Sequence, residues 1–424
     1  MKNENYEICI VGLGYVGLPL AIAFSKKFRV VGYDINLDRV QELKSGTDST
    51  LEIKNNELKE INNISFTSSI KDASNCNVYI ITVPTPIDSL NKPDLNPLIN
   101  SSKSVGSVLN IKNIVIYEST VYPGVTEDVC VPELENISGL KFNKDFYCGY
   151  SPERINPGDT EHKVSNILKV TSGSTPKIAV TINKLYQEII SAGTFLASSI
   201  KVAEASKVIE NVQRDVNIGL INELALIFNR LGIDTNEVIE AASTKWNFIK
   251  YTPGLVGGHC IGIDPYYLSF VSEEMGYKPD LILAARQINN GMSDFIVNQT
   301  FNEMLKANKE VKGANILILG LTFKENCPDI RNTRVINLIE KLKELNIKVD
   351  VFDPWVNLPK EIKYYKHGII SDPRKSQKKY DAIIVAVAHD YFKKFTTDHY
   401  TKMSKGKEVI IDIKNIVEKP TWRL

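Results

Sequence analysis

The segment GLVGGHCIGIDPYY, residues 254–267, places a cysteine among residues that could bring it to a ligand. Cys260 follows Gly257 and Gly258 closely, and Asp264 lies four residues after it. Buried structural cysteines usually stand in apolar runs, whereas glycines let a backbone approach a ligand or adopt a positive φ. These residue types allow either a reactive thiol or a tight glycine turn with an incidental cysteine.

A glycine pattern typical of dinucleotide binding lies near the start of the chain. GLGYVG, residues 12–17, follows an apolar segment that predicts a strand and opens a segment that predicts a helix. Asp34 ends the next predicted strand, where its carboxylate could accept hydrogen bonds from the adenosine ribose. That carboxylate would repel a 2′-phosphate and favours NAD, although the nearby Arg39 could accept the phosphate of NADP. Without a ligand, the pattern would be a tight strand–helix turn.

Three polar residues recur at helical spacing in the segment 200–231. Lys207, Asn211 and Arg214 stand at i, i+4 and i+7 and would share one face of a helix. A polar face is usually solvated, but asparagine is a poor residue for an exposed helix interior. Both a solvated face and a functional face remain open at this point.

Two further polar segments have the character of binding loops. SPERINPG, residues 151–158, holds Glu153 and Arg154 between two prolines and predicts an irregular loop. In residues 320–334, Lys324 and Arg331 follow a predicted strand, where α/β sheets bind ligands. The alternatives are a surface turn with a solvated Glu–Arg pair and an ordinary charged helix start.

The elements around these residues predict an α/β fold. In the first region, predicted strands alternate with helices, which favours a parallel sheet covered by helices. These strands are residues 6–12, 29–35, 77–86 and 113–120. From about Lys312 the pattern returns without a GxGxxG, with a helix over 332–345 and strands at 314–324, 348–354, 381–389 and 408–415. The helix over 200–231 lies between these regions, either continuous or broken near Gly219.

The totals exclude several classes of protein. A net charge of +1 over 424 residues gives no sign of nucleic-acid or membrane binding, and no apolar run approaches a membrane span. The six cysteines show no CxxC spacing, so we expect no disulfide framework and no metal site. The start of the chain lacks the features of a signal peptide, and we expect a cytoplasmic protein.

Taken together, the motifs resemble one family along essentially the whole chain. GLGYVGLPLA, VPTP, EST, SPERINPG, KVIEN, GGHCIGIDP and FKENCPDIR, in this order, are similar to the nucleotide-sugar 6-dehydrogenases, the UDP-glucose/GDP-mannose dehydrogenase family. The resemblance is strongest to members that oxidise UDP-N-acetylglucosamine or UDP-N-acetylgalactosamine for surface polysaccharides. It implies NAD as cofactor, a UDP-N-acetylhexosamine as substrate, and a four-electron oxidation at C6 of the sugar.

The resemblance also implies roles for individual residues. Cys260 would be the nucleophile, and Lys207 would stabilise the C6 oxygen or relay its proton. Asn211 and Asp264 would orient that oxygen or a water. Glu153 would be the base for hydrolysis, and Thr120 would also belong to the catalytic residues. NAD would be lined by Gly12, Gly14, Tyr15, Val16, Gly17, Asp34, Arg39, Thr85, Thr120 and Arg331. The substrate would be bound by Arg154, Ile155, Lys207, Asn211, Arg214, Gly257, Phe323 and Lys324.

The implied organisation is two Rossmann-like parallel-sheet domains joined by a long central helix. We expect an NAD-binding domain over residues 1–195, a central helical dimerisation domain with the cysteine loop over 196–311, and a UDP-sugar-binding domain over 312–424. The long helix would pair two chains in a homodimer.

Two departures from the family pattern leave the sugar open. Pro157 stands where the UDP-glucose branch usually keeps a second glutamate. Members acting on N-acetylmannosamine usually carry a basic residue some fourteen to sixteen positions before the cysteine; here Thr244 and Trp246 flank Lys245. UDP-glucose and UDP-N-acetylmannosamine are the alternative substrates. A single-step hydroxy-acid dehydrogenase would need no cysteine, and an NAD-binding redox sensor would not need Lys207, Asn211 and Cys260 together.

Overall fold

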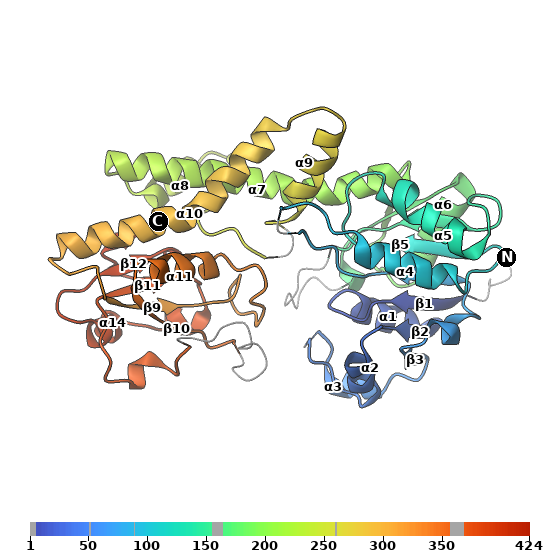
Figure 1. Ribbon diagram of the computed structural model, residues 1–424, viewed down its shortest axis with the longest axis horizontal. Coiled ribbons are helices and arrows are strands. Elements are labelled where there is room, and N and C mark those ends of the chain that lie inside the picture. Colours follow the sequence, from blue (N-terminus) through green and yellow to red (C-terminus); the bar gives the residue numbers. More distant parts are fainter. Residues whose placement is uncertain (1–5, 51, 89, 155–163, 259–260, 357–368) are drawn as a thin grey trace. The chain divides into compact units, whose positions relative to one another are not determined.

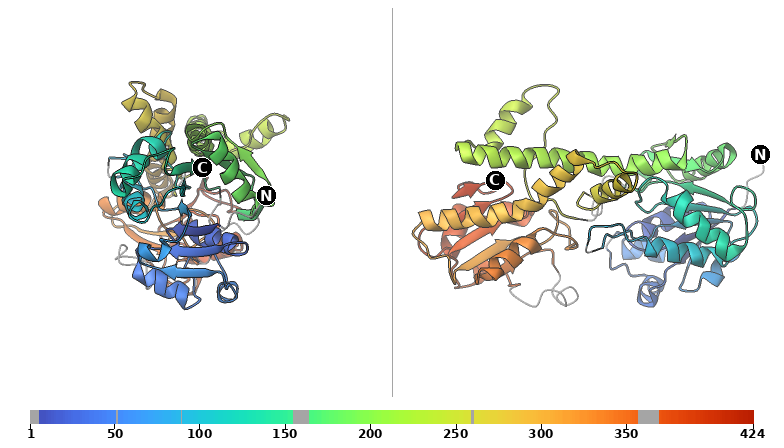
Figure 2. Two further views of the ribbon diagram at one scale, coloured as in Figure 1. Left: turned by 90° about the vertical axis from the view of Figure 1, so that its right-hand side faces the viewer. Right: turned by 45° about the horizontal axis from the view of Figure 1, so that its top comes forward.

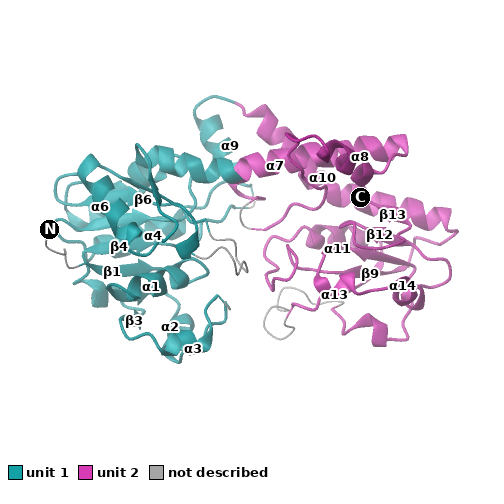
Figure 3. Ribbon diagram, turned by 180° about the vertical axis from the view of Figure 1, so that it is seen from behind, with its two compact units in different colours: residues 1–210, 266–277 teal, residues 211–265, 278–424 magenta. Residues whose placement is uncertain are grey.

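The computed structural model describes residues 6–50, 52–88, 90–154, 164–258, 261–356 and 369–424. Their contacts divide the chain into two compact units, coloured teal and magenta in Figure 3. Unit 1 comprises residues 1–210 and 266–277, and unit 2 comprises residues 211–265 and 278–424. Each unit is built around one β-sheet.

Among the described residues, the sheet of unit 1 has eight strands in the order β3-β2-β1-β4-β5-β6-β7-β8. Figure 1 labels β1, β2, β3 and β5 of this sheet. Its pairings are parallel, except that β6 and β7 run antiparallel. The predicted parallel arrangement is therefore confirmed for the first strands of the chain and changes direction once, after β6. The strands are β1 (Glu7–Val11), β2 (Arg29–Tyr33), β3 (Ile64–Thr67), β4 (Val78–Ile81), β5 (Ile114–Tyr117), β6 (Tyr147–Tyr150), β7 (Lys169–Gly173) and β8 (Thr194–Leu196).

Alternate residues of these strands enter two hydrophobic clusters, because successive side chains point to opposite faces of a sheet. In β1, Cys9 and Val11 join one cluster with α4, α5 and the start of α7, whereas Ile8 and Ile10 join another with α1 and α6. Helices thus cover both faces, as a buried parallel sheet requires. The helical segments in the order of the chain are α1 (Gly17–Ser25), α2 (Leu37–Lys44), α3 (Asn55–Lys59), η1 (Ile70–Ala73), α4 (Asn96–Gly106), η2 (Thr126–Cys130), α5 (Val131–Ser138), η3 (Val164–Asn166), α6 (Pro176–Gln187), α7 (Ile200–Leu231) and α9 (Asp264–Glu274).

Unit 2 contains the second predicted sheet, which is parallel throughout its described strands, in the order β10-β9-β11-β12-β13. One hydrophobic cluster joins this sheet to α10 and α11, and another joins it to α13 and α14. The strands are β9 (Asn315–Leu319), β10 (Lys348–Phe352), β11 (Ala382–Val385), β12 (Ile410–Asp412) and β13 (Trp422–Arg423). The helical segments are α8 (Thr235–Ser243), α10 (Asp280–Lys306), α11 (Val335–Glu344), η4 (Pro373–Lys375), α13 (Asp390–Lys393) and α14 (Thr397–Met403).

The long helix α7 is continuous over Ile200–Leu231, as the views in Figure 2 show, so the alternative of two helices broken near Gly219 is wrong. Gly219 instead marks a close helix contact. A Cβ at this position would lie 3.0 Å from the Cβ of Ala285 in α10. The missing side chain lets the two helices of unit 2 approach each other.

Candidate active site

The turn between β1 and α1 is tight, and its glycines have distinct roles. Gly12 has φ +93°, and its N–H donates to the Tyr33 carbonyl over 2.8 Å. A Cβ at Gly17 would lie 1.8 Å from the Gly12 carbonyl oxygen, so only glycine permits this close packing of helix against turn. A Cβ at Gly14 would meet no protein atom within 4 Å, which leaves the start of α1 open to a ligand. Tyr15 and Val16, half-buried, complete the turn.

Asp34 directly follows β2 and faces the glycine turn. Its Oδ2 accepts the Leu13 N–H over 2.8 Å, and its side chain is only partly buried, so the carboxylate remains accessible to a ribose. Arg39 is buried; its Nε donates to the Leu13 carbonyl over 2.9 Å, and its Nη2 pairs with the Asp48 carboxylate at 2.8 Å. A 2′-phosphate would have to compete with Asp48 and Glu42 for this guanidinium, so the residues fit NAD better than NADP.

The carboxyl ends of the neighbouring strands β4 and β5 contribute two threonines beyond that turn. The Thr85 hydroxyl donates to the Thr120 carbonyl over 2.7 Å, which joins the two loops. Tyr267 is buried and donates its hydroxyl to the Thr85 carbonyl over 2.9 Å. Both threonines are half-buried. They lie where an open α/β sheet binds its ligand.

Glu153 and Arg154 follow β6. Glu153 is 8% exposed, and its Oε1 accepts the backbone N–H of Arg154 over 2.6 Å. The Arg154 guanidinium pairs with Glu210 of α7 and donates to the Leu168 carbonyl over 3.2 Å. The pair is therefore not the freely solvated turn that the sequence left open. Ile155 lies outside the described residues.

The polar residues predicted on α7 differ in burial. Lys207 and Asn211 are buried, at 8% and 5% exposure, whereas Arg214 is exposed. The alternative of a solvated face is thus wrong for the first two. In unit 2, the Asn211 amide donates to Oδ2 of Asp264 over 2.5 Å, and Asp264 is 2% exposed at the start of α9.

Cys260 lies outside the described residues, but the glycines before it are held firmly. The Asn222 side chain binds Gly254 twice, accepting its N–H over 2.8 Å and donating to its carbonyl over 3.1 Å. The N–H of Gly258, at φ +85°, donates to the Asn332 carbonyl over 3.2 Å. A Cβ at Gly257 would lie 2.6 Å from that same carbonyl oxygen.

The loop after β9 packs against these glycines. A Cβ at Gly258 would lie 2.8 Å from the Phe323 ring, so glycine is needed for the contact. Lys324 is half-buried, and its carbonyl accepts the Thr322 hydroxyl over 2.9 Å. Arg331 is more exposed and pairs with Asp329 at 2.6 Å. Within unit 2, the structure thus brings together Gly257, Phe323 and Lys324.

Five further thiols lie in the described part of the chain. Cys9, Cys76, Cys130, Cys148 and Cys327 are free and buried. Burial raises the pKa of Cys76 and of Cys130 to about 12 and that of Cys148 well above its ordinary value. Such thiols are poor nucleophiles, because the thiolate is the reactive form.

The buried polar clusters that the sequence did not predict include one in each unit. In unit 1, Lys169 binds Glu118 and lies near Glu153. In unit 2, His389 and Asp353 form a pair with both side chains fully buried. Lys169 stands alone in an otherwise uncharged strand, a signal that could have found it. The partners lie 51 and 36 residues apart in the chain, so no local pattern shows them.

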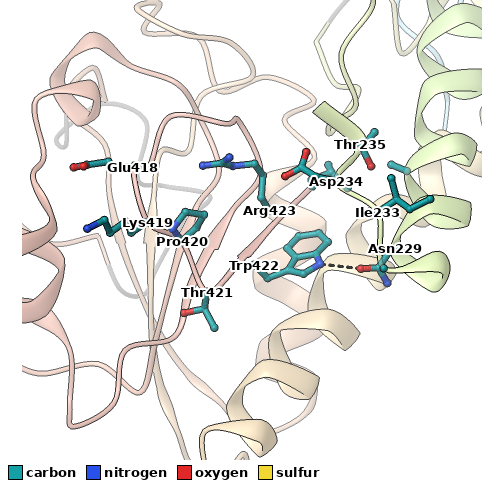
Figure 4. A pocket seen from close by; sticks show the side chains of 13 residues that line it. Asn229, Ile233, Asp234, Thr235, Glu418, Lys419, Pro420, Thr421, Trp422 and Arg423 are labelled. Carbon is teal, nitrogen blue, oxygen red and sulfur yellow. Dashed lines mark hydrogen bonds between the residues drawn. The ribbon is translucent and has the colours of Figure 1, made fainter. Parts of the chain in front are cut away.

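A cavity of about 570 Å³ lies in unit 2 (Figure 4). It is lined by the end of α7, the start of α8 and residues 418–424, and the Trp422 indole N–H donates to Asn229 there. None of the predicted site residues that the structure describes lines it. Within the described ranges, no group of three or more His, Cys, Asp or Glu residues could hold a metal ion, and no helix is long and apolar enough to cross a membrane.

Comparisons with known proteins cover nearly the whole chain. Three domains of the UDP-glucose/GDP-mannose dehydrogenase family match it: the NAD binding domain over residues 6–190, the central domain over 201–291 and the UDP binding domain over 317–419. The UDP-N-acetyl-D-glucosamine 6-dehydrogenase of Pseudomonas aeruginosa is 57% identical, with 98% of both chains covered, and that of Salmonella typhi is 55% identical over 98% of this chain and 97% of the relative. A solved UDP-D-ManNAc dehydrogenase from Pyrococcus horikoshii is 34% identical, with a TM-score of 0.89 and 98% of both chains covered.

Proposed function

Because the chain belongs to the UDP-glucose/GDP-mannose dehydrogenase family, we propose that it oxidises the C6 alcohol of a UDP-N-acetylhexosamine to the uronic acid. The chain is an NAD-dependent dehydrogenase of nucleotide-sugars. The sugar would be UDP-N-acetylglucosamine or UDP-N-acetylgalactosamine. The observation that carries this choice is the 57% identity, over nearly the full length, to a UDP-N-acetyl-D-glucosamine 6-dehydrogenase.

Cys260 would make the four-electron oxidation possible in one site. NAD, when bound, accepts the hydride that leaves C6 in each of two oxidation steps. Between them, the Cys260 sulfur adds to the C6 aldehyde, and oxidation of this thiohemiacetal gives a thioester. Water then cleaves the C–S bond and releases the acid. The raised pKa values of the buried thiols at Cys76, Cys130 and Cys148 support Cys260 as the reactive thiol.

Lys207, Asn211 and Asp264 would act at the C6 oxygen. The Lys207 ammonium would stabilise negative charge there and exchange a proton with it. The hydrogen bond from Asn211 to Asp264 fixes the amide orientation, so the remaining polar atoms can orient the C6 oxygen or a water. All three side chains are buried, which supports this role. Exposed side chains would be less fixed in orientation, and water would weaken the effect of their charges.

The loops of the first sheet would hold the cofactor and the hydrolytic base. NAD would lie along the glycine turn, with Asp34 on the ribose and Thr85 and Thr120 beyond the neighbouring strands. Glu153 would take a proton from the water that attacks the thioester. The Arg154 guanidinium is paired with Glu210. It would contact the substrate either by leaving this ion pair or by binding the substrate and Glu210 together.

The remaining predicted residues would serve the nucleotide-sugar. Phe323 and Lys324 would bind it from the second sheet, next to Gly257, while Ile155 and Arg214 would contact it and Arg331 the cofactor. We propose three functional domains with the limits 1–195, 196–311 and 312–424. The family's UDP binding domain, matched over residues 317–419, supports the last assignment.

An apolar stripe on α7 supports a homodimer. Exposed apolar side chains stand at Val202, Ile209, Leu220, Ile227 and Leu231. Their intervals each come close to whole turns of a helix with 3.6 residues per turn, so they fall on one side of α7. A second copy of this stripe would cover it. Light scattering that reports a monomer at micromolar concentration would contradict the dimer.

We place the reaction in the cytoplasm, where it would supply precursors of a surface polysaccharide. The five described cysteines are free, and a thiolate nucleophile needs a reducing compartment to stay reduced.

NADH formation across a panel of UDP-sugars tests the function. We expect two NADH per sugar and a product heavier than the substrate by the change from alcohol to acid. UDP-N-acetylglucosamine and UDP-N-acetylgalactosamine should exceed UDP-glucose by about five- to 150-fold in kcat/KM, the range that an unpaired polar group costs. Cys260→Ala should form no acid and still bind the nucleotide-sugar. One NADH per sugar, or acid formation by the alanine variant, would contradict the mechanism.

A further inference from the structure

A buried cation lies directly behind the proposed hydrolytic base in unit 1. Lys169, the first residue of β7, is 4% exposed. Its Nζ donates to the Pro152 carbonyl over 3.0 Å and lies 3.8 Å from Oε2 of Glu153. Lys169 therefore contacts both the backbone that carries Glu153 and the carboxylate itself.

A second carboxylate holds the other side of this ammonium. Lys169 Nζ donates to Oε2 of Glu118 over 2.6 Å, and the Tyr186 hydroxyl of α6 donates to the other oxygen of Glu118. The Glu118 side chain is fully buried just beyond β5. One cation thus serves two carboxylates, with its shorter contact to the one that lies deeper in the fold.

A purely structural role explains this arrangement poorly. Burying an ion pair costs about as much as the pair returns, so apolar residues of similar size usually stabilise a core equally well. Burial raises the pKa of Glu118, whereas the Lys169 ammonium lowers it. The charge of Lys169 therefore acts on the carboxyl groups beside it, and Glu153 is one of them.

We propose that Lys169 is a positioning residue for Glu153: it fixes the carboxylate and supplies a positive charge beside it for the hydrolysis of the thioester, while Glu118 and Tyr186 hold Lys169 in place. This inference rests on the proposed function. In the step concerned, the water oxygen bonds to the thioester carbon, the C–S bond breaks with its electron pair on sulfur, and Glu153 takes the proton of the water. No oxidation occurs in this step.

The charged residues beside Glu153 in the described part of unit 1 include Glu118, Lys169 and Arg154. Glu118 repels it, Lys169 attracts it, and Arg154 donates a backbone N–H to it while its guanidinium pairs with Glu210. Removing the positive charge of Lys169 should therefore disfavour the ionised base. Removing the negative charge of Glu118 should favour it.

The test follows the decay of the acyl-enzyme by intact-protein mass spectrometry, with the NADH burst recorded in parallel over a range of pH. In Lys169→Met the burst of two NADH per site should remain, whereas hydrolysis slows by about 10- to 100-fold, a typical part of a general base's contribution. The acid limb of the hydrolysis profile should move up by about one pH unit, as expected for loss of an opposite charge within 4 Å. Lys169→Arg should restore part of the rate, and Lys184→Met, at an exposed position of α6, should have no effect.

Glu118→Gln gives the opposite sign and remains decisive if Lys169→Met fails to fold. It keeps an acceptor for Tyr186 and removes one negative charge, so the acid limb should move to lower pH. Packing damage alone would not shift the two variants in opposite directions. Hydrolysis at the wild-type rate and pH in Lys169→Met, or an unmoved limb in Glu118→Gln, would overturn the proposal. Wild type that forms no acyl-enzyme with any nucleotide-sugar would instead contradict the proposed function.

Discussion

The first turns of the two sheets share one backbone geometry and use it differently. In unit 1, Gly12 follows β1 at φ +93°, and its N–H donates to the last carbonyl of β2; in unit 2, Gly320 follows β9 at φ +97°, and its N–H donates to the last carbonyl of β10. In each unit an aspartate comes next after the second strand. Asp34 accepts the N–H of Leu13, and Asp353 accepts that of Leu321.

The two aspartates, Asp34 and Asp353, differ in how deeply they are buried. The Asp34 side chain is only partly buried, whereas that of Asp353 is fully buried and also accepts from Thr322 over 3.0 Å. His389 approaches the same oxygen at 3.0 Å, while its Nδ1 accepts the N–H of Asn326. Asp353 is thus occupied by its own protein, and it fixes the loop that carries Phe323 and Lys324.

The comparison shows that a strand–glycine–aspartate frame does not by itself define a dinucleotide site. Whether such a turn can bind a ribose depends on whether its carboxylate is accessible. In unit 1 the carboxylate remains accessible to a ribose, and in unit 2 it organises a loop. Variants at matched positions test this difference.

The largest effect is expected for Asp353→Ala. It removes the acceptor of two buried backbone N–H groups and the partner of His389, and each unpaired buried group costs about 1–3 kcal/mol. We expect the free energy of unfolding to fall by about 3 kcal/mol or more, measured by urea denaturation. Asp34→Ala, the matched control, should lose less than about 1 kcal/mol, because the Asp34 side chain is only partly buried. Equal losses in the two variants would remove the distinction.

The second-largest effect is the difference in stability between Gly320→Ala and Gly12→Ala. Both introduce a side chain at positive φ, which costs about 1–2 kcal/mol. The new Cβ at position 320 would also lie 2.5 Å from the Cβ of Val387. The new Cβ at position 12 would come no closer than 3.3 Å to its nearest neighbour, Cγ1 of Val83. Thermal unfolding should therefore show the larger drop for Gly320→Ala. A larger drop for Gly12→Ala would mean that the frame of unit 1 is the tighter one.

The glycine turn with Asp34 in unit 1 could be predicted from the sequence, whereas the corresponding turn with Asp353 in unit 2 was not. GLGYVG and Asp34 form a local pattern whose spacing has a physical meaning, and the structure places them as expected. The Asp353–His389 and Glu118–Lys169 pairs depend on which distant segments meet in the fold, which residue spacing does not encode. The role of Gly219 was missed for the same reason, since its neighbour Ala285 lies on another helix.

Cofactor preference should change in Asp34→Ala by a smaller amount. The variant loses both the acceptor for the ribose 2′-hydroxyl and the charge that repels a 2′-phosphate. The ratio of kcat/KM for NAD over NADP should fall by roughly tenfold, about the value of one hydrogen bond to a charged group. Arg39 limits any gain with NADP, because it stays paired with Asp48. Steady-state kinetics with both cofactors measure the ratio, and wild type using both equally would contradict the assignment of Asp34.

The smallest effect is a pH dependence that belongs to unit 2. Burial raises the pKa of Asp353, but the hydrogen bond from His389 and the backbone N–H groups of Leu321 and Trp355 outweigh it, so the pKa lies below its ordinary value. A carboxyl whose pKa is lower in the folded state contributes stability above its unfolded pKa of about 3.9 and loses it as the pH falls through the folded value. One such group changes the free energy of unfolding by at most about 1.4 kcal/mol per pH unit. Between pH 4 and pH 2, wild type should therefore lose more stability than Asp353→Asn, which cannot ionise, and denaturation at each pH gives the difference. Parallel curves for the two proteins would show that Asp353 is not held as a carboxylate and that burial, rather than its partners, determines its state.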